Sequence, residues 1–280
     1  MLLRHCVLPI QTCRRLFSTR RAFDPVRRLE YFDEENGFRD FITNEPALFK
    51  QTFRTVPAIA KWFTVCTTDD TSHELDSSYL DQHGTSIVPL ELSRSTPPTT
   101  SFERFEAPFS LLLAHMRSAD TPDTRLYLAQ HSLADLPAAL QADVPIPPLV
   151  ARLGRGDIYA SSLWMGRPPT RTPLHRDPNP NLFVQLAGRK RVRLMRPDVG
   201  RALYERVGNG LGRANMRGDE MMQGREMEAL EEAVWEDDAE GPGVEAELSS
   251  GDGLYIPLGW WHAVHGVRRG ANASVNWWFR

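Results

Sequence analysis

Two histidines and one carboxylate are the residues of this sequence whose types and spacing could bind a metal ion. His175-Arg176-Asp177 places an imidazole and a carboxylate two positions apart, and side chains two apart on an extended segment point to the same side. His262 follows 87 residues after His175, directly after two tryptophans and an apolar segment that predicts a strand. Such a strand could bring a second imidazole beside the first pair.

The composition of this ligand set favours one kind of metal chemistry. Two histidines and one carboxylate leave three positions open on an octahedral metal, which is the facial arrangement of non-haem Fe(II) oxygenases. Zinc is more often enclosed by a fourth protein ligand, and the sequence offers no clear one. His265, three residues after His262, is an alternative third ligand.

The elements that must position these residues are mostly short strands. Strand patterns occupy 181–186, 191–195, 253–257 and 271–279, and the turn at 187–189 predicts a hairpin between the first two. The last segment alternates cleanly, which predicts a half-buried strand. Helical patterns occur earlier, at 57–63 and 108–116, and Asp24-Pro25 predicts a helix start. Many short strands with Gly and Pro turns predict a sandwich or barrel.

Length and composition set the class of protein. The chain has 280 residues, 41% hydrophobic and 25% charged, which suits one large globular domain with a sizeable core. No apolar run approaches the roughly 20 residues of a membrane-spanning helix. The net charge of −3 argues against a dedicated DNA- or RNA-binding protein, which usually has a strongly basic face.

The first 23 residues differ from the rest in composition. They contain five arginines and no acidic residue, interleaved with apolar residues, Ser and Thr. This is typical of a mitochondrial presequence, so we expect 1–23 to direct the chain to the mitochondrial matrix. Two of the three cysteines lie within it, and Cys66 alone allows neither a disulfide framework nor a cysteine-based zinc site.

An acidic segment lies within a stretch at about 200–247 that we interpret as an insert. Residues 226–247 hold ten acidic residues and no basic one, with Met227, Leu230 and Val234 at helical spacing. One interpretation is a solvated amphipathic helix followed by a loop. The other is an acidic wall that attracts a basic partner or substrate, and the sequence leaves both open.

Together, the two metal-ligand motifs resemble a known family. His175-Arg176-Asp177 combined with the segment from Gly251-Asp252-Gly253 to Trp260-Trp261-His262 looks like the JmjC, or cupin-type, Fe(II)- and 2-oxoglutarate-dependent oxygenases. Within them it is most similar to the small hydroxylases, typified by the asparaginyl hydroxylase of hypoxia-inducible factor. The resemblance covers roughly residues 30–280. It implies a mainly β fold with flanking helices: a double-stranded β-helix (jelly-roll) core at about 124–280 and an α-helical N-terminal part at about 24–123.

The resemblance also implies a role for particular residues. His175, Asp177 and His262 match the iron ligands of the family. Lys190, one of only three lysines, lies fifteen residues after His175 and matches the lysine that binds the distal carboxylate of 2-oxoglutarate; the alternative is a surface base in the segment Arg189-Lys190-Arg191. A buried carboxylate needs charge-assisted hydrogen bonds. Thr172 and Tyr127 match hydroxyl donors to that carboxylate. Asn181 and Asn276 match polar residues beside the metal-bound end of 2-oxoglutarate. Trp278 would form a wall of the pocket, and plain core packing is an equal alternative for it.

The activity that the resemblance implies is hydroxylation of a C–H bond, with Fe(II) as cofactor and O₂ and 2-oxoglutarate as co-substrates. 2-Oxoglutarate would be decarboxylated to succinate. A protein side chain is the favoured substrate, while RNA or a small molecule stays open. JmjC-type N-methyl-lysine demethylation is the alternative within the same chemistry. A non-catalytic cupin that serves as a binding or assembly module is the alternative outside it.

Overall fold

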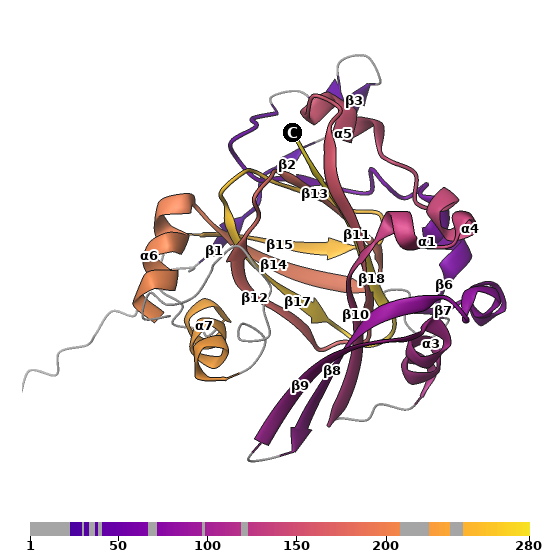
Figure 1. Cartoon of the computed structure of the whole chain (residues 1–280). Helices are drawn as coiled ribbons and strands as arrows, with labels where there is room; N and C mark the ends of the chain where they lie inside the picture. The colour runs from indigo at the N-terminus through magenta and orange to yellow at the C-terminus, as the bar shows by residue number, and fades with distance from the viewer. Residues whose placement is uncertain are drawn as a thin grey trace, which may run out of the picture.

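The computed structural model describes residues 23–29, 31–33, 37–38, 41–66, 72–96, 99–118, 123–207, 224–235 and 243–280. Two β-sheets dominate these residues (Figure 1). The five-stranded sheet has the order β1 (Phe23–Pro25), β15 (Gly243–Ser249), β14 (Arg189–Met195), β17 (Trp261–Val267) and β12 (Thr170–Arg176). The nine-stranded sheet has the order β2 (Arg28–Leu29), β5 (Ala47–Phe49), β16 (Gly253–Ile256), β13 (Asn181–Ala187), β18 (Asn272–Phe279), β11 (Ile158–Gly166), β10 (Thr124–Ser132), β8 (Ile87–Thr96) and β9 (Thr99–Pro108).

The chain passes repeatedly from one sheet to the other. After β12 in the five-stranded sheet it enters β13 in the nine-stranded sheet, returns for β14 and β15, and then alternates through β16, β17 and β18. This alternation wraps the chain around a common interior, as in a double-stranded β-helix. The predicted mainly β fold with a jelly-roll core is therefore confirmed.

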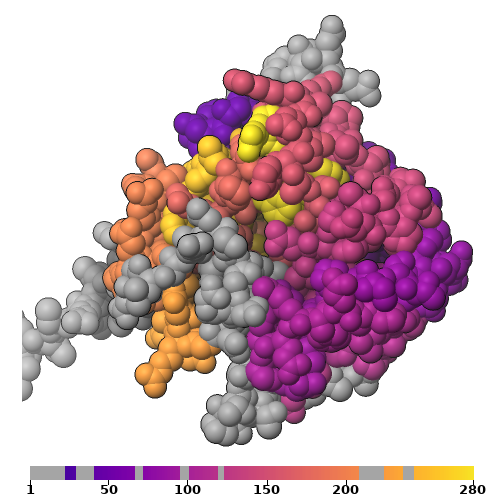
Figure 2. All heavy atoms as spheres, viewed as in Figure 1, coloured from indigo at the N-terminus to yellow at the C-terminus, as the bar shows by residue number. Residues whose placement is uncertain are grey.

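Helices cover the outer faces of both sheets. Helices α6 (Pro197–Val207) and α7 (Arg225–Trp235) pack through Leu203, Leu230 and Val234 on the five-stranded sheet. The shorter helices pack on the nine-stranded sheet in the largest apolar cluster; they are α1 (Pro57–Trp62), α2 (Ser77–Leu80), α3 (Phe109–Arg117), α4 (Ala138–Ala142) and α5 (Pro148–Leu153). Figure 2 shows the orange residues of α6 and α7 at the left of this face and a purple part of the N-terminal half at its lower right. No helix among the described residues is long and apolar enough to cross a membrane.

The N-terminal part combines helices with strands. Helices α1 and α3 confirm the patterns at 57–63 and 108–116, whereas β8 and β9 extend the nine-stranded sheet and were not predicted. Two small hairpins complete this part: β3 (Tyr31–Asp33) with β4 (Gly37–Phe38), and β6 (Phe63–Val65) with β7 (His73–Leu75). The predicted helix start at Asp24-Pro25 is wrong, because these residues form β1 and pair with β15. Pairing with a distant strand overrides the local helix signal here. Phe23 lies opposite Gly243, and its ring occupies the space that a side chain at position 243 would need.

The predicted hairpin across 187–189 is also wrong. Strand β13 pairs with β16 and β18, whereas β14 pairs with β15 and β17, so the turn connects two sheets. Gly188 has φ +68°, and a Cβ there would lie 2.5 Å from the carbonyl oxygen of Ala271. A left-handed glycine makes this corner possible, because it has no Cβ to clash.

The last strand is fully buried rather than half-buried. Every residue of β18 is buried, because the strand lies between β13 and β11 in the middle of the nine-stranded sheet. Its apolar residues Val275, Trp277 and Phe279 join the cluster beneath the helices. Its polar residues face the interior between the two sheets, where the candidate site lies.

The acidic stretch at 226–247 forms the predicted helix only in its first part. Helix α7 is amphipathic as predicted, with Leu230 and Val234 buried, but 243–247 belong to β15. Glu245 pairs with Arg193 at 2.7 Å and Glu247 with Arg189 at 3.0 Å, so these acids are matched by arginines of the neighbouring strand. Residues 208–223 and 236–242 of the predicted insert lie outside the described residues, as does 1–22 of the predicted presequence.

Candidate metal and co-substrate site

The three predicted metal ligands lie together at one end of the paired strands β12 and β17. His175 and His262 are directly opposed in this antiparallel pair, and Asp177 follows the end of β12. His175 Nε2 lies 3.8 Å from Asp177 Oδ1, and His262 Nε2 lies 3.6 Å from Asp177 Oδ2. The ligand atoms of all three lie within 4.8 Å of one another. This spacing allows all three to bind one ion.

Hydrogen bonds orient each ligand toward a common point. His175 Nδ1 lies 2.9 Å from the Pro173 carbonyl oxygen, and His262 Nδ1 lies 3.3 Å from that of Trp260. A carbonyl can only accept, so Nδ1 carries the hydrogen and Nε2 presents its lone pair. Asp177 accepts a 2.8 Å hydrogen bond from the Asn181 amide, which in turn accepts one of 2.8 Å from Asn276.

The donor set fits a divalent first-row metal with open coordination positions. Among the described residues, no fourth His, Cys, Asp or Glu joins the three. Two imidazole nitrogens and one carboxylate oxygen suit Fe(II) and leave room for ligands other than protein. The interior also contains polar atoms that need such a ligand: Trp278 Nε1 and Asn276 Oδ1 are buried without a hydrogen-bond partner in the described part of the chain.

Lys190 lies inside the protein rather than on its surface. It projects from β14 into the interior and is 3% exposed, so the interpretation as a surface base is wrong. Its ammonium donates to Ser274 Oγ at 2.7 Å and lies 3.5 Å from the Tyr127 hydroxyl. A buried ammonium beside hydroxyl donors is suited to binding a carboxylate. Ser274 was missed by the sequence reasoning, although it lies two positions before Asn276 on the same face of one strand.

All eight predicted site residues line one cavity between the two sheets. His175, Asp177 and His262 lie at one end, and Lys190, Tyr127 and Thr172 line it with Asn181 and Asn276. Trp278 also faces the cavity, which decides between its two sequence interpretations. Trp164, Phe183 and Val264 complete the lining and were not predicted. They could have been found only once the strand register showed which alternate residues point inward.

His265 does not belong to the metal cluster. It lies three residues beyond His262 on β17 and therefore points to the opposite face of the sheet. There its Nε2 lies 2.7 Å from Glu231 of α7, and its ring stacks on Trp235 with centroids 3.7 Å apart. The alternative third ligand is therefore excluded by geometry.

Comparison with known proteins agrees with this fold. A family model described as a cupin-like domain matches residues 36–280. The chain belongs to the cupin-like JmjC family of Fe(II)- and 2-oxoglutarate-dependent oxygenases. The match includes both sheets of the jelly roll except β1 and β2, and every described residue that lines the cavity.

Several JmjC relatives are similar over part of their length. Lysine-specific demethylase JMJ30 of Arabidopsis thaliana is 28% identical over 275 residues, covering 97% of this chain and 58% of the relative. Lysine-specific demethylase 8 of Danio rerio is 32% identical over 154 residues, 54% of this chain and 36% of the relative. Jumonji C domain-containing protein 5 of Drosophila melanogaster is 28% identical over 253 residues, 88% of this chain and 57% of the relative. The chain thus spans about half the length of these relatives or less.

Proposed function

We propose that this JmjC oxygenase hydroxylates a C–H bond of a protein side chain, coupled to the decarboxylation of 2-oxoglutarate to succinate. One observation carries the proposal: the His175–Asp177–His262 cluster and the buried Lys190 line the same cavity between the sheets. A metal cluster alone would suit many cupins. A buried cation in the same cavity adds a place for a dicarboxylic acid.

The cavity offers a distinct set of contacts for each bound group. His175, Asp177 and His262 would hold Fe(II). The keto-acid end of 2-oxoglutarate would complete the metal coordination beside Asn181 and Asn276. Lys190, Tyr127 and Thr172 would bind the distal carboxylate. Iron bound in this way, with O₂ and 2-oxoglutarate, supplies the oxidising chemistry that places a hydroxyl group on carbon.

The protein itself contributes position and the exclusion of water. The hydrogen bonds from Nδ1 of each imidazole to a backbone carbonyl keep both rings aimed at one point, and Asn181 does the same for Asp177. Apolar walls from Phe183, Val264 and Trp278 limit access of water to the interior. Holding the metal, co-substrate and target carbon in one geometry lowers the entropic part of the barrier.

Demethylation of N-methyl-lysine is the second candidate, because relatives from Arabidopsis thaliana and Danio rerio are named lysine-specific demethylases. The two activities differ in product. Hydroxylation retains the new oxygen on the substrate, whereas hydroxylation of an N-methyl group releases that carbon as formaldehyde. Mass spectrometry of candidate proteins, together with a formaldehyde assay, separates them.

The decisive experiment is an anaerobic titration of the full-length chain with Fe(II) and 2-oxoglutarate. We expect a visible metal-to-ligand charge-transfer band that is absent from His175→Ala and unchanged in His83→Ala, a histidine outside the cavity. A folded, metal-loaded protein that gives no band would contradict the oxygenase proposal. That result would favour the non-catalytic cupin, which serves as a binding or assembly module.

We also propose that the enzyme acts in the mitochondrial matrix. The proposal rests on the arginine-rich, acid-free composition of residues 1–23. A C-terminal fluorescent fusion of the full-length chain should colocalise with a matrix marker, and deletion of 1–23 should abolish this. Unchanged distribution after the deletion would show that these residues are not the targeting signal.

A further inference from the structure

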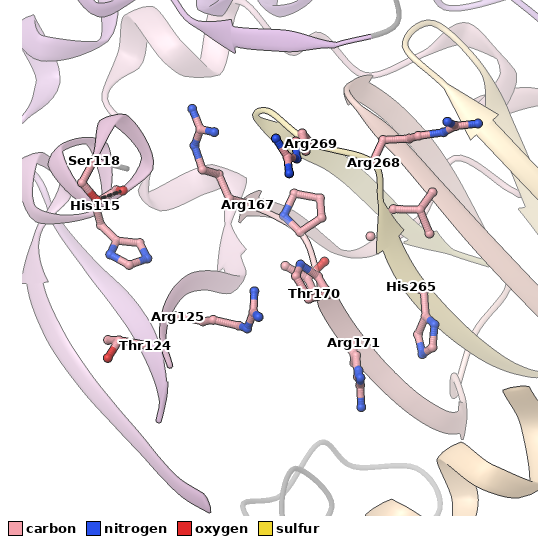
Figure 3. Close-up of a pocket in the computed structure, with 14 residues that line it drawn as sticks. His115, Ser118, Thr124, Arg125, Arg167, Thr170, Arg171, His265, Arg268 and Arg269 are labelled. Atoms are coloured by element: carbon pink, nitrogen blue, oxygen red, sulfur yellow. Dashed lines mark hydrogen bonds between the residues drawn. The ribbon is translucent and has the colours of Figure 1, made fainter. Parts of the chain in front are cut away.

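A basic groove lies beside the candidate site and, among the described residues, shares no lining residue with it. We define it by its five arginines, Arg125, Arg167, Arg171, Arg268 and Arg269, together with His115 and His265. Its volume is about 510 Å³, and no Asp or Glu is among the described residues that line it. Figure 3 shows Arg125 entering from the β10 side and Arg171 from β12 on the other side. A cluster of this kind contrasts with the net charge of −3 of the whole chain.

Part of the groove continues the cavity along the same strands, whereas Arg171 and His265 reach the groove from the opposite face of β12 and β17, where both contact Glu231. Tyr127, Thr172 and Val264 line the cavity, and the residues two positions away on the same strands, Arg125, Thr170 and Gly266, line the groove. Residues two apart point to the same face of a sheet. Thr170 and His175 are five positions apart on β12, which corresponds to about 16 Å. An extended segment of about five residues therefore spans the distance from the groove to the metal ligands.

Two of the arginines are presented to solvent without a counter-ion among the described residues. Arg268 and Arg269 are exposed in the turn between β17 and β18, and no acidic side chain of the described residues lies within ion-pair distance of either. Arg268 has φ +70°, a left-handed conformation that costs free energy for a residue with a Cβ. By contrast, Arg167 bonds Glu74, and Arg171 lies 3.9 Å from Glu231. The guanidinium groups of Arg268 and Arg269 are thus available to bind an external anion.

From this groove we infer that the enzyme binds an acidic segment of its protein substrate, with the modified residue reaching the metal cavity about five positions away. Arginine favours this partner, because its planar guanidinium binds carboxylates through paired hydrogen bonds. A nucleic acid fits less well, because single strands are usually held by aromatic stacking and the described residues of the groove lining include no Phe, Tyr or Trp. The inference rests on the proposed function, since it assigns part of the substrate of that same site.

The test is a binding measurement that needs no turnover. Fluorescence anisotropy of the full-length chain would be recorded with a labelled peptide of alternating Glu and Gly, with its Gln–Gly counterpart, and with oligouridylate. We expect the Glu peptide to bind, the Gln peptide to bind at least about tenfold more weakly, and rising salt to weaken the Glu complex. Equal binding of both peptides, or tighter binding of oligouridylate, would overturn the inference.

Two variants with the same change in charge locate the binding surface. Arg268→Asn/Arg269→Gln removes both exposed groove charges, and Asn tolerates the left-handed conformation at 268. Arg155→Gln/Arg201→Gln removes two exposed arginines outside the groove. We expect the first pair to raise the Kd for the Glu peptide about tenfold, as the loss of charge-assisted hydrogen bonds predicts, and the second to change it less than about twofold. Equal effects of the two pairs would show that only overall charge matters and would contradict the inference.

The charge-transfer titration separates this inference from the proposed function. A band with Fe(II) and 2-oxoglutarate but no binding of the Glu peptide would overturn the groove alone and leave the oxygenase intact. Peptide binding without a band would contradict the oxygenase proposal and, with it, the groove as a substrate site.

Discussion

Asn181 shows how a residue outside the candidate metal ligands can orient one of them. Its amide donates to Asp177 Oδ2 at 2.8 Å, and its own oxygen accepts from Asn276, so Asp177 is held by a chain of two buried amides. Removing the hydrogen-bond partner of a metal ligand typically lowers the metal affinity by about 10–100-fold. The orientation of Asp177 therefore depends on β13 and β18 as well as on β12.

We predict that Asn181→Ala weakens metal binding about 10–100-fold, because Asp177 loses the hydrogen bond that orients its carboxylate. The affinity can be measured without catalysis, by titrating the full-length protein with Mn(II) and following the free ion by electron paramagnetic resonance. Asn179→Ala, at a buried asparagine on the neighbouring segment, is the control. Equal Mn(II) affinity of Asn181→Ala and wild type would show that this bond has no role in metal binding.

We predict that Lys190→Met raises the Kd of 2-oxoglutarate at least about tenfold, because a charge-assisted hydrogen bond to a buried carboxylate contributes about 1.5–3 kcal/mol. Mn(II) affinity should stay the same, because Lys190 is not a metal ligand. Calorimetric titration of the Mn(II)-loaded protein with 2-oxoglutarate measures the effect. If Lys190→Met bound the co-substrate as tightly as wild type, the distal carboxylate would need another partner.

At the scale of elements, the corner at Gly188 allows consecutive strands to enter different sheets. Strand β13 carries Asn181 in the nine-stranded sheet, and β14 carries Lys190 in the five-stranded sheet. The two side chains face each other across the cavity only because the chain changes sheets at Gly188. A simple hairpin would have placed them in one sheet, on neighbouring strands.

We predict that Gly188→Ala destabilises the protein by about 2–4 kcal/mol, because the new Cβ adds a clash with the Ala271 carbonyl to the cost of a left-handed alanine. Gly156→Ala is a matched control, since Gly156 has φ +80° and nothing within 4 Å of a Cβ. We expect about 1–2 kcal/mol there from the backbone alone. Urea unfolding measures both values, and equal destabilisation would show that the contact with Ala271 has no cost.

At the scale of the whole molecule, a buried carboxylate joins the N-terminal helices to the rest of the fold. Asp143, at the end of α4, is 1% exposed and accepts hydrogen bonds from Lys61 at 2.6 Å, Trp62 at 2.9 Å and Tyr79 at 2.6 Å. Burial opposes its ionisation, but the hydrogen bonds from these three donors outweigh burial and lower the pKa of Asp143. The donors come from α1 and α2, so one carboxylate fixes three helices.

We predict that the ionisation of Asp143 makes the stability of the protein depend on pH in acid. The pKa of Asp143 is lower in the folded state than its ordinary value of 3.8, so its ionised form stabilises the fold above about pH 4. That stabilisation is lost as the pH falls through the folded-state pKa. Asp143→Asn should therefore lower the free energy of unfolding at pH 7 by about 1–3 kcal/mol, with a smaller difference from wild type near pH 3. Urea unfolding at the two pH values tests this, and a pH-independent difference would contradict it.

The sequence by itself determined which residues form the candidate site. His175, Asp177, His262 and Lys190 were found from residue types and spacing together with a family resemblance, and the structure brings all four to one cavity. Short-range patterns also predicted α1, α3 and the strands β13, β14, β16 and β18. Such features depend on local periodicity and on motifs that are short enough to read along the chain.

Only the tertiary structure decided which strands pair and which faces are covered. The strand at Asp24-Pro25, the change of sheet at Gly188 and the double burial of β18 all depend on partners far along the chain. The same is true of the basic groove, whose arginines come from β10, β12 and two turns. Local sequence cannot specify these features, because strand pairing and packing are decided by contacts between segments that are distant in sequence.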